Sequence, residues 1–415
     1  MQRVAILSLH SSPLAALGRA NVGGMQVYVR RLAEELSRLG IAVDVFTRRA
    51  DAKAPEVQPI GDGARVVHLE GGPAKPLPKS VLPLHIPAMT ASLHSFVSRE
   101  RLRYDVLHSH YWISGLVALR CQDELQAPVV HMFHTLSKVK EFYNGGQDPS
   151  DSALRFDGER FVIVSADAVV GATEGEREQM ERLYGVSPLS FSVVPPGVDL
   201  DLFAPLDRDV SRRTLGLDGE RILLFVGRPD RIKGLDVLLH AFADLEAELR
   251  RGTKLVVVGD RDTEQEMRKG RYQAMVRNLA LDGAVEFHGI VPHDRLPIYY
   301  SAADICTVPS AYESFGMVAV EAMACQTPVV AFGVGGPAAT VTDGQTGFLA
   351  KAGDRTDFAA KLRQALSSHD LVHMGRRARM SVRKYEWSSV VARTIDQYDR
   401  ALHASLLCSR ASGGC

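Results

Sequence analysis

Two glutamates eight residues apart, Glu313 and Glu321, stand out in the segment ESFGMVAVE. The run around the second, VAVEAMA, is otherwise apolar, and a carboxylate among alanines and methionines is costly to bury unless it is hydrogen-bonded. Glu313 precedes the helix predicted here. The free backbone N–H groups of residues 314–317 point out of the N-terminus of this helix, where Glu313 lies. The pattern predicts one carboxylate at a helix N-terminus and a buried one two turns into the helix. An exposed glutamate on an amphipathic helix is a weaker alternative, because polar residues do not surround Glu321.

A second group of residues is suited to binding phosphate. Arg228 and Lys233 lie five residues apart in a loop between a strand predicted at 222–227 and an apolar helix predicted over 235–249. Two cations in a loop that leads into a helix N-terminus suit a diphosphate. A solvated basic loop explains the same residues, and both interpretations stay open.

A glycine pair, Gly23 and Gly24, precedes a helix predicted over 25–39, which Gly40 terminates. Two glycines let the backbone approach a ligand closely, and a helix N-terminus favours negative charge. An ordinary turn followed by a helix start is the alternative.

The elements that must position these residues alternate between short β-branched runs and helical periodicity. This alternation predicts a mostly parallel sheet covered by helices on both faces. The strands predicted in the first half of the chain are 3–9, 41–47, 64–69, 104–110, 128–134 and 168–173.

The pattern restarts after residues 191–208, which are rich in Pro, Gly and Asp and are predicted to be a linker. The second series of predicted strands is 222–227, 254–259, 285–290, 304–309 and 328–332. We therefore expect an α/β chain with two doubly wound domains, at 1–200 and 201–385, and a helix at 386–407 that packs back across both. In such sheets ligands bind beyond the carboxyl ends of the strands, here in a cleft between the domains.

The glycine pair, the Arg228–Lys233 loop, the Glu313-x7-Glu321 segment and the two Rossmann-like units together resemble glycosyltransferase family 4. The resemblance covers essentially the whole chain. It implies the GT-B fold and a retaining enzyme that uses a nucleotide-sugar donor, with a UDP-sugar favoured over a GDP-sugar.

Matching positions imply the donor-site roles. Arg228 and Lys233 would bind the diphosphate and stabilise the departing nucleotide, Glu313 would bond the sugar hydroxyls, and Glu321 would take the ribose hydroxyls. The other residues implied to bind the donor are Gly23, Gly24, Ser314, Phe315, Gly316 and Met317, with Val291 in the 287–291 segment that frames the base. His134, in HMFHTL, matches a family histidine that reaches the donor sugar; a strand-end histidine with a structural role is the alternative. The implied catalytic set is Glu313, His134, Arg228 and Lys233.

No metal or other cofactor is expected, because the two cations and the helix dipoles supply the charge that a divalent ion would otherwise provide. Retention of configuration would proceed by same-face attack, with the leaving phosphate assisting deprotonation of the acceptor. The sequence offers no obvious nucleophile for a double displacement.

The N-terminal half resembles two branches of the family that bind a phosphorylated acceptor. These are the D-inositol-3-phosphate glycosyltransferases of mycothiol biosynthesis and sucrose-phosphate synthase. Residues matching Lys79, Tyr111, Thr135 and Arg155 clasp the acceptor phosphate in the first branch, and two cations with two hydroxyls form a reasonable phosphate pocket. Gln26 is a further expected acceptor contact.

The chain also departs from both branches. The loop reads Gly-Gly-Met25-Gln26, whereas one branch usually has Asn after Met and the other has Gly-Gly-Gln. Gln326 stands where the family commonly has Gly. A family 4 transferase with a non-phosphorylated specialised metabolite or a lipid as acceptor, and a non-catalytic nucleotide-sugar sensor, therefore stay open. The best candidate for a membrane-binding helix, residues 89–103, is only modestly amphipathic and basic.

Composition sets the remaining bounds. The 415 residues are 46% hydrophobic and 24% charged, which is ordinary for a globular protein, and 49 basic residues balance 49 acidic ones. We expect no nucleic-acid partner, because the basic excess of phosphate-backbone binders is missing. Five widely spaced cysteines without CxxC pairs, and no signal or membrane-spanning segment, predict a cytoplasmic protein with reduced thiols. The sequence does not determine the oligomeric state, and a homodimer stays open.

Overall fold

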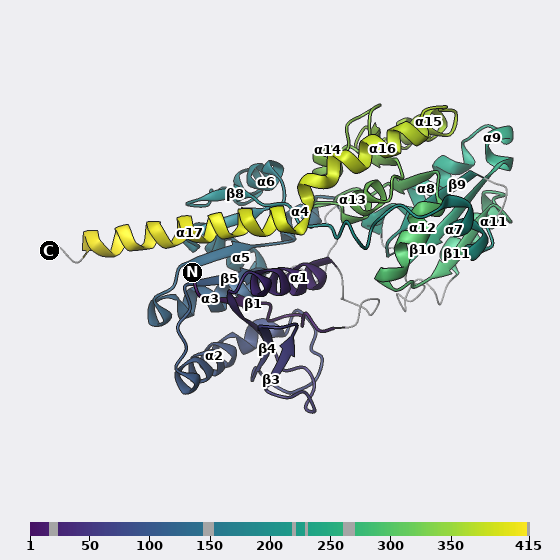
Figure 1. Cartoon of the computed structure of the whole chain (residues 1–415). Coiled ribbons are helices and arrows are strands. Elements are labelled where there is room, and N and C mark those ends of the chain that lie inside the picture. The colour runs from purple at the N-terminus through teal and green to yellow at the C-terminus, as the bar shows by residue number, and fades with distance from the viewer. Residues whose placement is uncertain (16–23, 144–152, 218–220, 229–230, 260–269, 413–415) are drawn as a thin grey trace. The chain divides into compact units, whose positions relative to one another are not determined.

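The computed structural model describes residues 1–15, 24–143, 153–217, 221–228, 231–259 and 270–412 (Figure 1). Of these, the residues up to Pro196 and those from Trp387 onward form one compact unit, and Gly197–Glu386 form a second. The observed junction at Pro196/Gly197 lies four residues before the predicted boundary at 200/201.

The first unit is built on an eight-stranded sheet with the strand order β3-β4-β2-β1-β5-β6-β7-β8. All neighbouring strands are parallel except β3 and β4, which are antiparallel. The strands are β1 (Arg3–Leu7), β2 (Ala42–Arg48), β3 (Val57–Ile60), β4 (Ala64–Leu69), β5 (Val106–His110), β6 (Val129–Met132), β7 (Ala168–Gly171) and β8 (Phe191–Val193). The order of the strands reverses between the parallel neighbours β1 and β5. Such a switch point is where ligands bind in open α/β sheets.

Helices follow these strands in the first unit. They are α1 (Gly24–Arg38), η1 (Leu82–His85), α2 (Ile86–Glu100), α3 (Trp112–Leu125), α4 (Ser137–Tyr143), α5 (Ala153–Ser165), α6 (Glu174–Tyr184) and α17 (Trp387–Ser412). The last of them, the long yellow helix in Figure 1, contacts α1 and β6. It is longer than the helix predicted over 386–407 and is part of the first unit.

The second unit holds a six-stranded, fully parallel sheet with the order β11-β10-β9-β12-β13-β14. Its strands are β9 (Arg221–Val226), β10 (Thr253–Val258), β11 (Val285–Gly289), β12 (Ile305–Val308), β13 (Val329–Phe332) and β14 (Gly347–Ala350). Its helices are α7 (Arg208–Leu215), η2 (Arg231–Lys233), α8 (Leu235–Ala243), α9 (Ala247–Arg251), α11 (Arg271–Asn278), η3 (His293–Arg295), α12 (Leu296–Ala302), α13 (Met317–Ala324), α14 (Gly335–Thr340), α15 (Arg355–Leu366), α16 (Leu371–Val382) and η4 (Arg383–Tyr385). The strand order of this sheet reverses between β9 and β12. The expected fold, two doubly wound parallel-sheet units, is confirmed.

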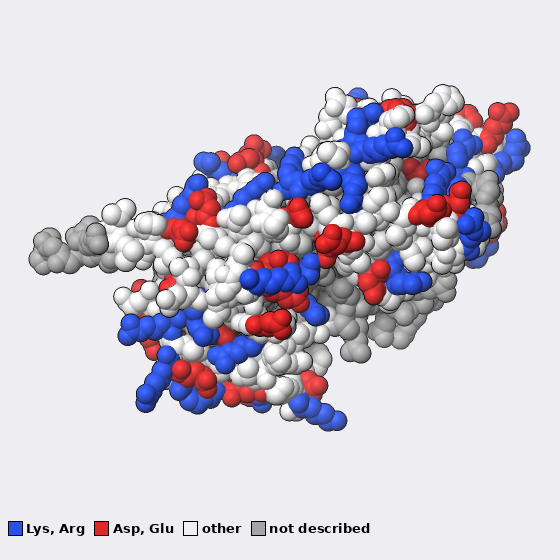
Figure 2. Space-filling view, viewed as in Figure 1, with Lys and Arg blue, Asp and Glu red and all other residues white. Residues whose placement is uncertain are grey.

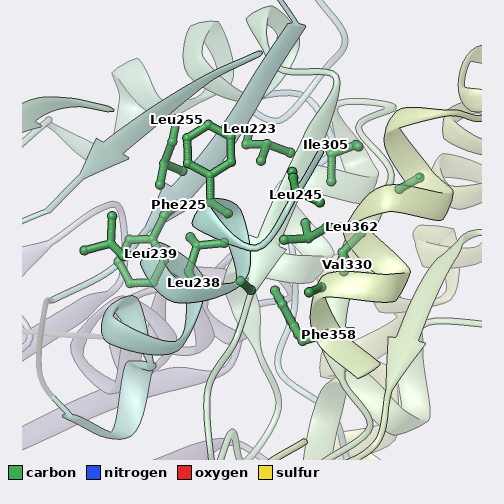
Figure 3. Close-up of a cluster of buried hydrophobic side chains, with 14 of the residues drawn as sticks. Leu223, Phe225, Leu238, Leu239, Leu245, Leu255, Ile305, Val330, Phe358 and Leu362 are labelled. Carbon is green, nitrogen blue, oxygen red and sulfur yellow. The ribbon is translucent and has the colours of Figure 1, made fainter. Parts of the chain in front are cut away.

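The core of the second unit forms where α8 and α15 pack on the sheet (Figure 3). Leu223, Phe225 and Leu255 from the strands meet Leu238 and Leu239 from α8. Strands buried on both faces are expected to be continuous apolar runs, which is why β9 (RILLFV) and β10 (TKLVVV) were evident in the sequence.

Three predictions about local structure were wrong. The helix predicted over 235–249 is interrupted between α8 and α9, and Leu245, 3% exposed, is buried in the core at the break. The segment predicted to be a linker, 191–208, does contain the junction between the units at Pro196/Gly197, but its first three residues form β8 and extend the sheet beside β7. Glu321 was predicted to lie two full turns into its helix. The helix begins only at Met317, so Glu321 lies just one turn from its start.

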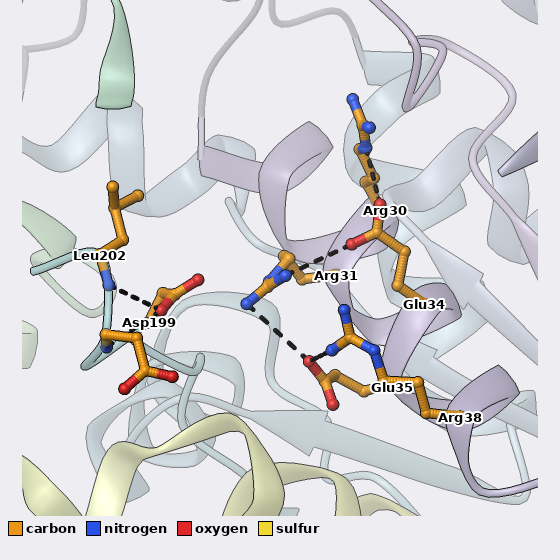
Figure 4. A network of polar contacts seen from close by, with 8 residues as sticks. Arg30, Arg31, Glu34, Glu35, Arg38, Asp199 and Leu202 are labelled. Carbon is orange, nitrogen blue, oxygen red and sulfur yellow. Dashed lines mark hydrogen bonds and ion pairs between the residues drawn. The ribbon is translucent and has the colours of Figure 1, made fainter. Parts of the chain in front are cut away.

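Charges of both signs are interspersed on the face of the molecule that Figure 2 shows. On α1, Arg30 and Arg31 pair with Glu34 at 2.9 and 3.5 Å, and Arg38 pairs with Glu35 (Figure 4). Partly exposed pairs three or four residues apart on one helix add little stability. Figure 4 also shows Asp199 of the second unit, whose carboxylate accepts a hydrogen bond from the backbone N–H of Leu202 at 3.0 Å.

No helix among the described residues is long and apolar enough to cross a membrane.

Candidate active site

In the second unit, the loops after β9 and β12 meet at the switch point of the sheet. The backbone N–H of Ala311 donates to the carbonyl oxygen of Ile232 at 2.8 Å and joins the two loops. Lys233 Nζ lies 2.5 Å from Glu313 Oε1, and Ser310 Oγ donates to the same oxygen at 2.9 Å. The structure thus places a cation and a carboxylate, predicted from separate segments, side by side. Both remain partly exposed, at 27% and 12% of their side chains.

Glycines hold this carboxylate loop against its neighbours. The N–H of Gly336 donates to the carbonyl oxygen of Glu313 at 3.0 Å. A Cβ atom would lie 1.8 Å from the Glu313 carbonyl oxygen if placed on Gly335, and 1.6 Å from the Phe315 carbonyl oxygen if placed on Gly336. Only glycine allows so close an approach of α14 to the 313–316 segment. This glycine pair was not predicted from the sequence; the letters GG after β13 were the available signal.

Glu321 is buried, as the sequence predicted, and both of its carboxylate oxygens are hydrogen-bonded. His293 Nε2 lies 2.9 Å from Oε1, and the Tyr300 hydroxyl donates to Oε2 at 2.9 Å. Burial lowers the pKa of His293, but the hydrogen bond and charge of Glu321 outweigh it, so the net shift of that pKa is upward. His293 and Tyr300 are further site residues that the sequence analysis did not identify.

The remaining residues predicted to bind the donor are divided between the two units. Arg228 is exposed two residues after the end of β9, and Val291 is partly exposed two residues after the end of β11. Ser314, Phe315 and Gly316 lead into α13, which begins at Met317. In the first unit, Gly24 is the first residue of α1, whereas Gly23 lies outside the described residues.

In the first unit, the residues predicted to bind the acceptor phosphate gather around the ring of Tyr111, which directly follows β5. Lys79 Nζ lies 5.8 Å from the ring centroid, and Arg155 Cζ lies 5.2 Å from it. An Nη2–H of Arg155 also donates to the carbonyl oxygen of Thr135 at 3.3 Å. The ring of His10, which follows β1, packs on the Tyr111 ring with a centroid distance of 4.0 Å. The structure therefore brings the four predicted residues together and adds His10.

Arg155 is buried against an acidic partner that the sequence analysis missed. Its Nε donates to Glu159 Oε1 at 2.8 Å, and Glu159 is fully buried. The other oxygen of Glu159 accepts from Ser137 Oγ at 2.5 Å and from the Tyr184 hydroxyl. The i,i+4 spacing of Arg155 and Glu159 was the available signal. Glu159 balances the charge of Arg155 and fixes the orientation of its guanidinium group.

Histidines fill the interior of the first unit beside this cluster. His108 and His110 are fully buried on β5, His131 is fully buried on β6, and His134 follows β6 with a φ of 59°. Burial lowers the pKa values of all four, to about 3 for His108 and His134. These imidazoles are therefore neutral at pH 7. Gln26, the remaining predicted acceptor contact, is buried on α1 and hydrogen-bonds to Ser11 Oγ.

Comparison with known proteins places the chain in a family. The family model described as Glycosyltransferase Family 4 matches residues 22–202, and the model described as Glycosyl transferases group 1 matches residues 207–387. The D-inositol 3-phosphate glycosyltransferase 2 of Catenulispora acidiphila is 40% identical over 97% of this chain and 95% of its own length. The chain belongs to glycosyltransferase family 4.

Other comparisons agree with this assignment. The D-inositol 3-phosphate glycosyltransferase of Kineococcus radiotolerans is also 40% identical, over 97% of this chain and 96% of its own. Among solved structures, sucrose-phosphate synthase from Thermosynechococcus elongatus matches with a TM-score of 0.87 and 31% identity, over 97% of this chain and 100% of its own. Anabaena HepE in complex with UDP and glucose has the same fold, with a TM-score of 0.75 at 18% identity over 96% and 100% of the two chains. The resemblance seen in the sequence, to family 4 and to these two branches, is confirmed.

Within this glycosyltransferase, both clusters of site residues follow the switch-point strands of their sheets. In the second unit, Lys233 and Glu313 follow β9 and β12. In the first unit, His10 and Tyr111 follow β1 and β5. Each sheet thus presents its polar side chains where the strand order reverses, as expected for ligand-binding α/β units.

Proposed function

We propose that this family 4 glycosyltransferase is a retaining enzyme that transfers a hexosyl group from a nucleotide sugar to a small phosphorylated acceptor. The acceptor is an inositol phosphate or a sugar phosphate, and the donor is a UDP-sugar in preference to a GDP-sugar. The observation that carries the proposal is the cluster around Tyr111. Two cations on one aromatic ring, one of them buried and oriented by Glu159, form a receptor for a small dianion.

The names of the relatives support the same acceptor class. Two relatives at 40% identity are D-inositol 3-phosphate glycosyltransferases, and the structural neighbour at 31% identity is a sucrose-phosphate synthase. Their names share a phosphate on a small polyhydroxylated molecule. Lys79, Tyr111 and Arg155, together with Thr135, supply the charge and hydrogen bonds that such a molecule needs.

The proposed donor site is the Lys233–Glu313 pair with its surroundings. A lysine ammonium has three N–H donors, so Lys233 can hold Glu313 and a diphosphate oxygen at the same time. Arg228 adds a second cation in the same loop, and Glu313 accepts hydrogen bonds from the sugar hydroxyls. Charge that develops on the departing diphosphate is then stabilised by side chains already in place, and no metal ion is required.

Glu321 completes the proposed donor site. Each of its oxygens already accepts one hydrogen bond, from His293 or Tyr300, and each keeps a second lone pair for a ribose hydroxyl. The acceptor hydroxyl attacks from the face that the nucleotide leaves, and the leaving phosphate takes its proton. The configuration at the anomeric carbon is then retained.

Nucleotide release and product mass, measured over a small grid of substrates, test the proposal. The donors are UDP-glucose, UDP-N-acetylglucosamine and GDP-mannose. The acceptors are inositol phosphate, fructose 6-phosphate and their dephosphorylated forms. We expect transfer from a UDP-sugar to one phosphorylated acceptor, with the donor's anomeric configuration in the product. Efficient transfer to the dephosphorylated acceptor, or an inverted product, would contradict the proposal.

A further inference from the structure

A line of buried imidazoles runs from α17 to His134. The Tyr398 hydroxyl on α17 lies 2.6 Å from His108 Nδ1. The rings of His108 and His110 contact each other with a centroid distance of 4.2 Å, and His110 Nδ1 lies 2.9 Å from His134 Nε2. His108 and His110 are fully buried, whereas His134 is only partly buried. The line therefore ends at the one histidine of the three that can reach a ligand.

From this geometry we infer that His110 is a positioning residue that fixes His134 in one tautomer and one orientation. The inference rests on the proposed function, in which His134 contacts the transferred sugar. A histidine that binds a sugar hydroxyl must present either an N–H donor or a bare nitrogen acceptor, and its other ring nitrogen decides which. Here that other nitrogen is Nε2, and its hydrogen-bond partner is His110.

Each neutral imidazole carries one N–H, and one of these two protons lies in the contact between His110 and His134. Two arrangements are therefore possible. In the first, His110 Nδ1–H donates to His134 Nε2, so His134 carries its own proton on Nδ1. In the second, His134 Nε2–H donates to His110 Nδ1, so His110 carries its proton on Nε2. Among the described residues, His110 Nε2 is buried without a hydrogen-bond partner. The second arrangement would bury an N–H donor with no acceptor there, and buried N–H groups of that kind are rare.

The first arrangement is therefore favoured, and His134 presents Nδ1–H as a hydrogen-bond donor to the sugar. The neighbours of His110 hold its ring in place for this task. His108 packs on the ring, and Tyr28 of α1 lies edge-on to both His110 and His134, with centroid distances of 5.7 and 5.5 Å. The positive φ of His134, 59°, marks a backbone held by its surroundings in a conformation that non-glycine residues rarely adopt.

The tautomer can be read directly by NMR. Protein labelled with ¹⁵N-histidine gives ring ¹H–¹⁵N correlations whose pattern distinguishes protonation at Nδ1 from protonation at Nε2, and the His134→Asn variant assigns the His134 signals by their loss. We expect His134 to be protonated at Nδ1 in the wild type. In His110→Leu, which fills the buried site with an apolar side chain, that single tautomer is lost.

Turnover provides the second readout. We expect His110→Leu to lower kcat about 10- to 100-fold, by analogy with metal-ligating histidines that lose the hydrogen-bond partner of their other ring nitrogen, with little change in the KM of the acceptor. His110→Asn, whose amide nitrogen lies near the position of Nδ1, should restore the tautomer and most of kcat. His131→Leu is the matched control, because His131 is equally buried but bonds to Ser109 and not to His134.

Protonation of His134 at Nε2 in the wild type would overturn the inference. An unchanged tautomer and kcat in a folded His110→Leu variant would also overturn it. If His134→Asn kept full turnover, the proposed role of His134 would fail instead, and the NMR experiment would still test the link between His110 and His134.

Discussion

At the scale of single residues, the Lys233–Glu313 pair is the centre of the proposed donor site. We expect Lys233→Ala to lower kcat about 100-fold or more, since it removes a cation aimed at the charge that develops on the diphosphate. Glu313→Gln should lower kcat to a similar extent, because the amide cannot pair with the ammonium group. Steady-state kinetics with a saturating nucleotide sugar measures both effects.

Arg231→Ala is the control for these variants. Arg231 lies two residues from Lys233 on the same short helix η2, and its side chain is exposed. Loss of one surface cation should leave kcat within a factor of two or so of the wild type. If Lys233→Ala behaved like Arg231→Ala, the donor site would not be where we place it.

Single residues also show what the sequence can and cannot reveal about the site. Glu321 was evident because one carboxylate stood in an apolar run, and burial of a charge demands partners. Its partners, His293 and Tyr300, come from η3 and α12, and nothing in their own sequence surroundings points to Glu321. Contacts between residues far apart in the chain depend on packing, which periodicity does not encode.

At the scale of elements, the contact between α14 and the 313–316 loop makes a prediction. Gly335 has a φ of 47°, and its added Cβ would lie 1.8 Å from the Glu313 carbonyl oxygen. We expect Gly335→Ala to displace that loop and to lower kcat/KM for the donor about tenfold or more, because misplacing a catalytic group by an ångström is costly. Steady-state kinetics at varied donor concentration checks the effect.

Gly353→Ala separates this displacement from the ordinary cost of losing a glycine. Gly353 has a φ of 72° but nothing within 4 Å of its added Cβ. Both variants carry the backbone strain of about 1 kcal/mol, and only Gly335→Ala carries the clash. Equal kinetics in the two variants would show that α14 does not position Glu313.

The elements themselves were predictable where burial was uniform. The central strands β1, β9, β10 and β12 are fully or almost fully buried, so each is a continuous apolar run in the sequence. The missed strands, β3, β8 and β14, are three or four residues long. β3 contains Pro59, which an edge strand tolerates but which argues against a strand in the sequence. Whether such a short segment forms a strand depends on the sheet beside it.

At the scale of the whole molecule, the buried histidines make stability depend on pH. Their folded-state pKa values lie below the unfolded value of about 6.5, so the unfolded chain binds protons first as the pH falls. The contribution of these four histidines to stability is therefore complete above about pH 7 and is lost at lower pH. The loss approaches about 1.4 kcal/mol per pH unit for each such histidine.

Urea unfolding at pH 5 to 7 measures this loss. Tryptophan fluorescence suits the first unit, because Trp112 and Trp387, the two tryptophans of the chain, both lie in it. We expect His131→Leu to reduce the pH dependence of the unfolding free energy by about 1.4 kcal/mol per unit near pH 5. His403→Gln, at an exposed position on α17, should leave the dependence unchanged. An unchanged slope in His131→Leu would show that this histidine is not held neutral.

The proposed function depends on selection of a phosphorylated acceptor by Lys79 and Arg155. Arg155→Ala would also strand the buried Glu159, so its effect on binding could not be separated from its effect on the fold. Lys79→Met avoids this difficulty, because Lys79 is exposed and methionine keeps most of the side-chain stem. Lys75→Met, at an exposed position four residues earlier, is the matched control.

The most direct measurement is therefore the ratio of kcat/KM for the phosphorylated acceptor to that for its dephosphorylated form, in the wild type and in both variants. We predict a large ratio in the wild type and in Lys75→Met. In Lys79→Met the ratio should fall about 10- to 100-fold, the cost of one charge-assisted hydrogen bond to phosphate. A wild-type ratio near one, or an equal loss on both acceptors in Lys79→Met, would contradict the account.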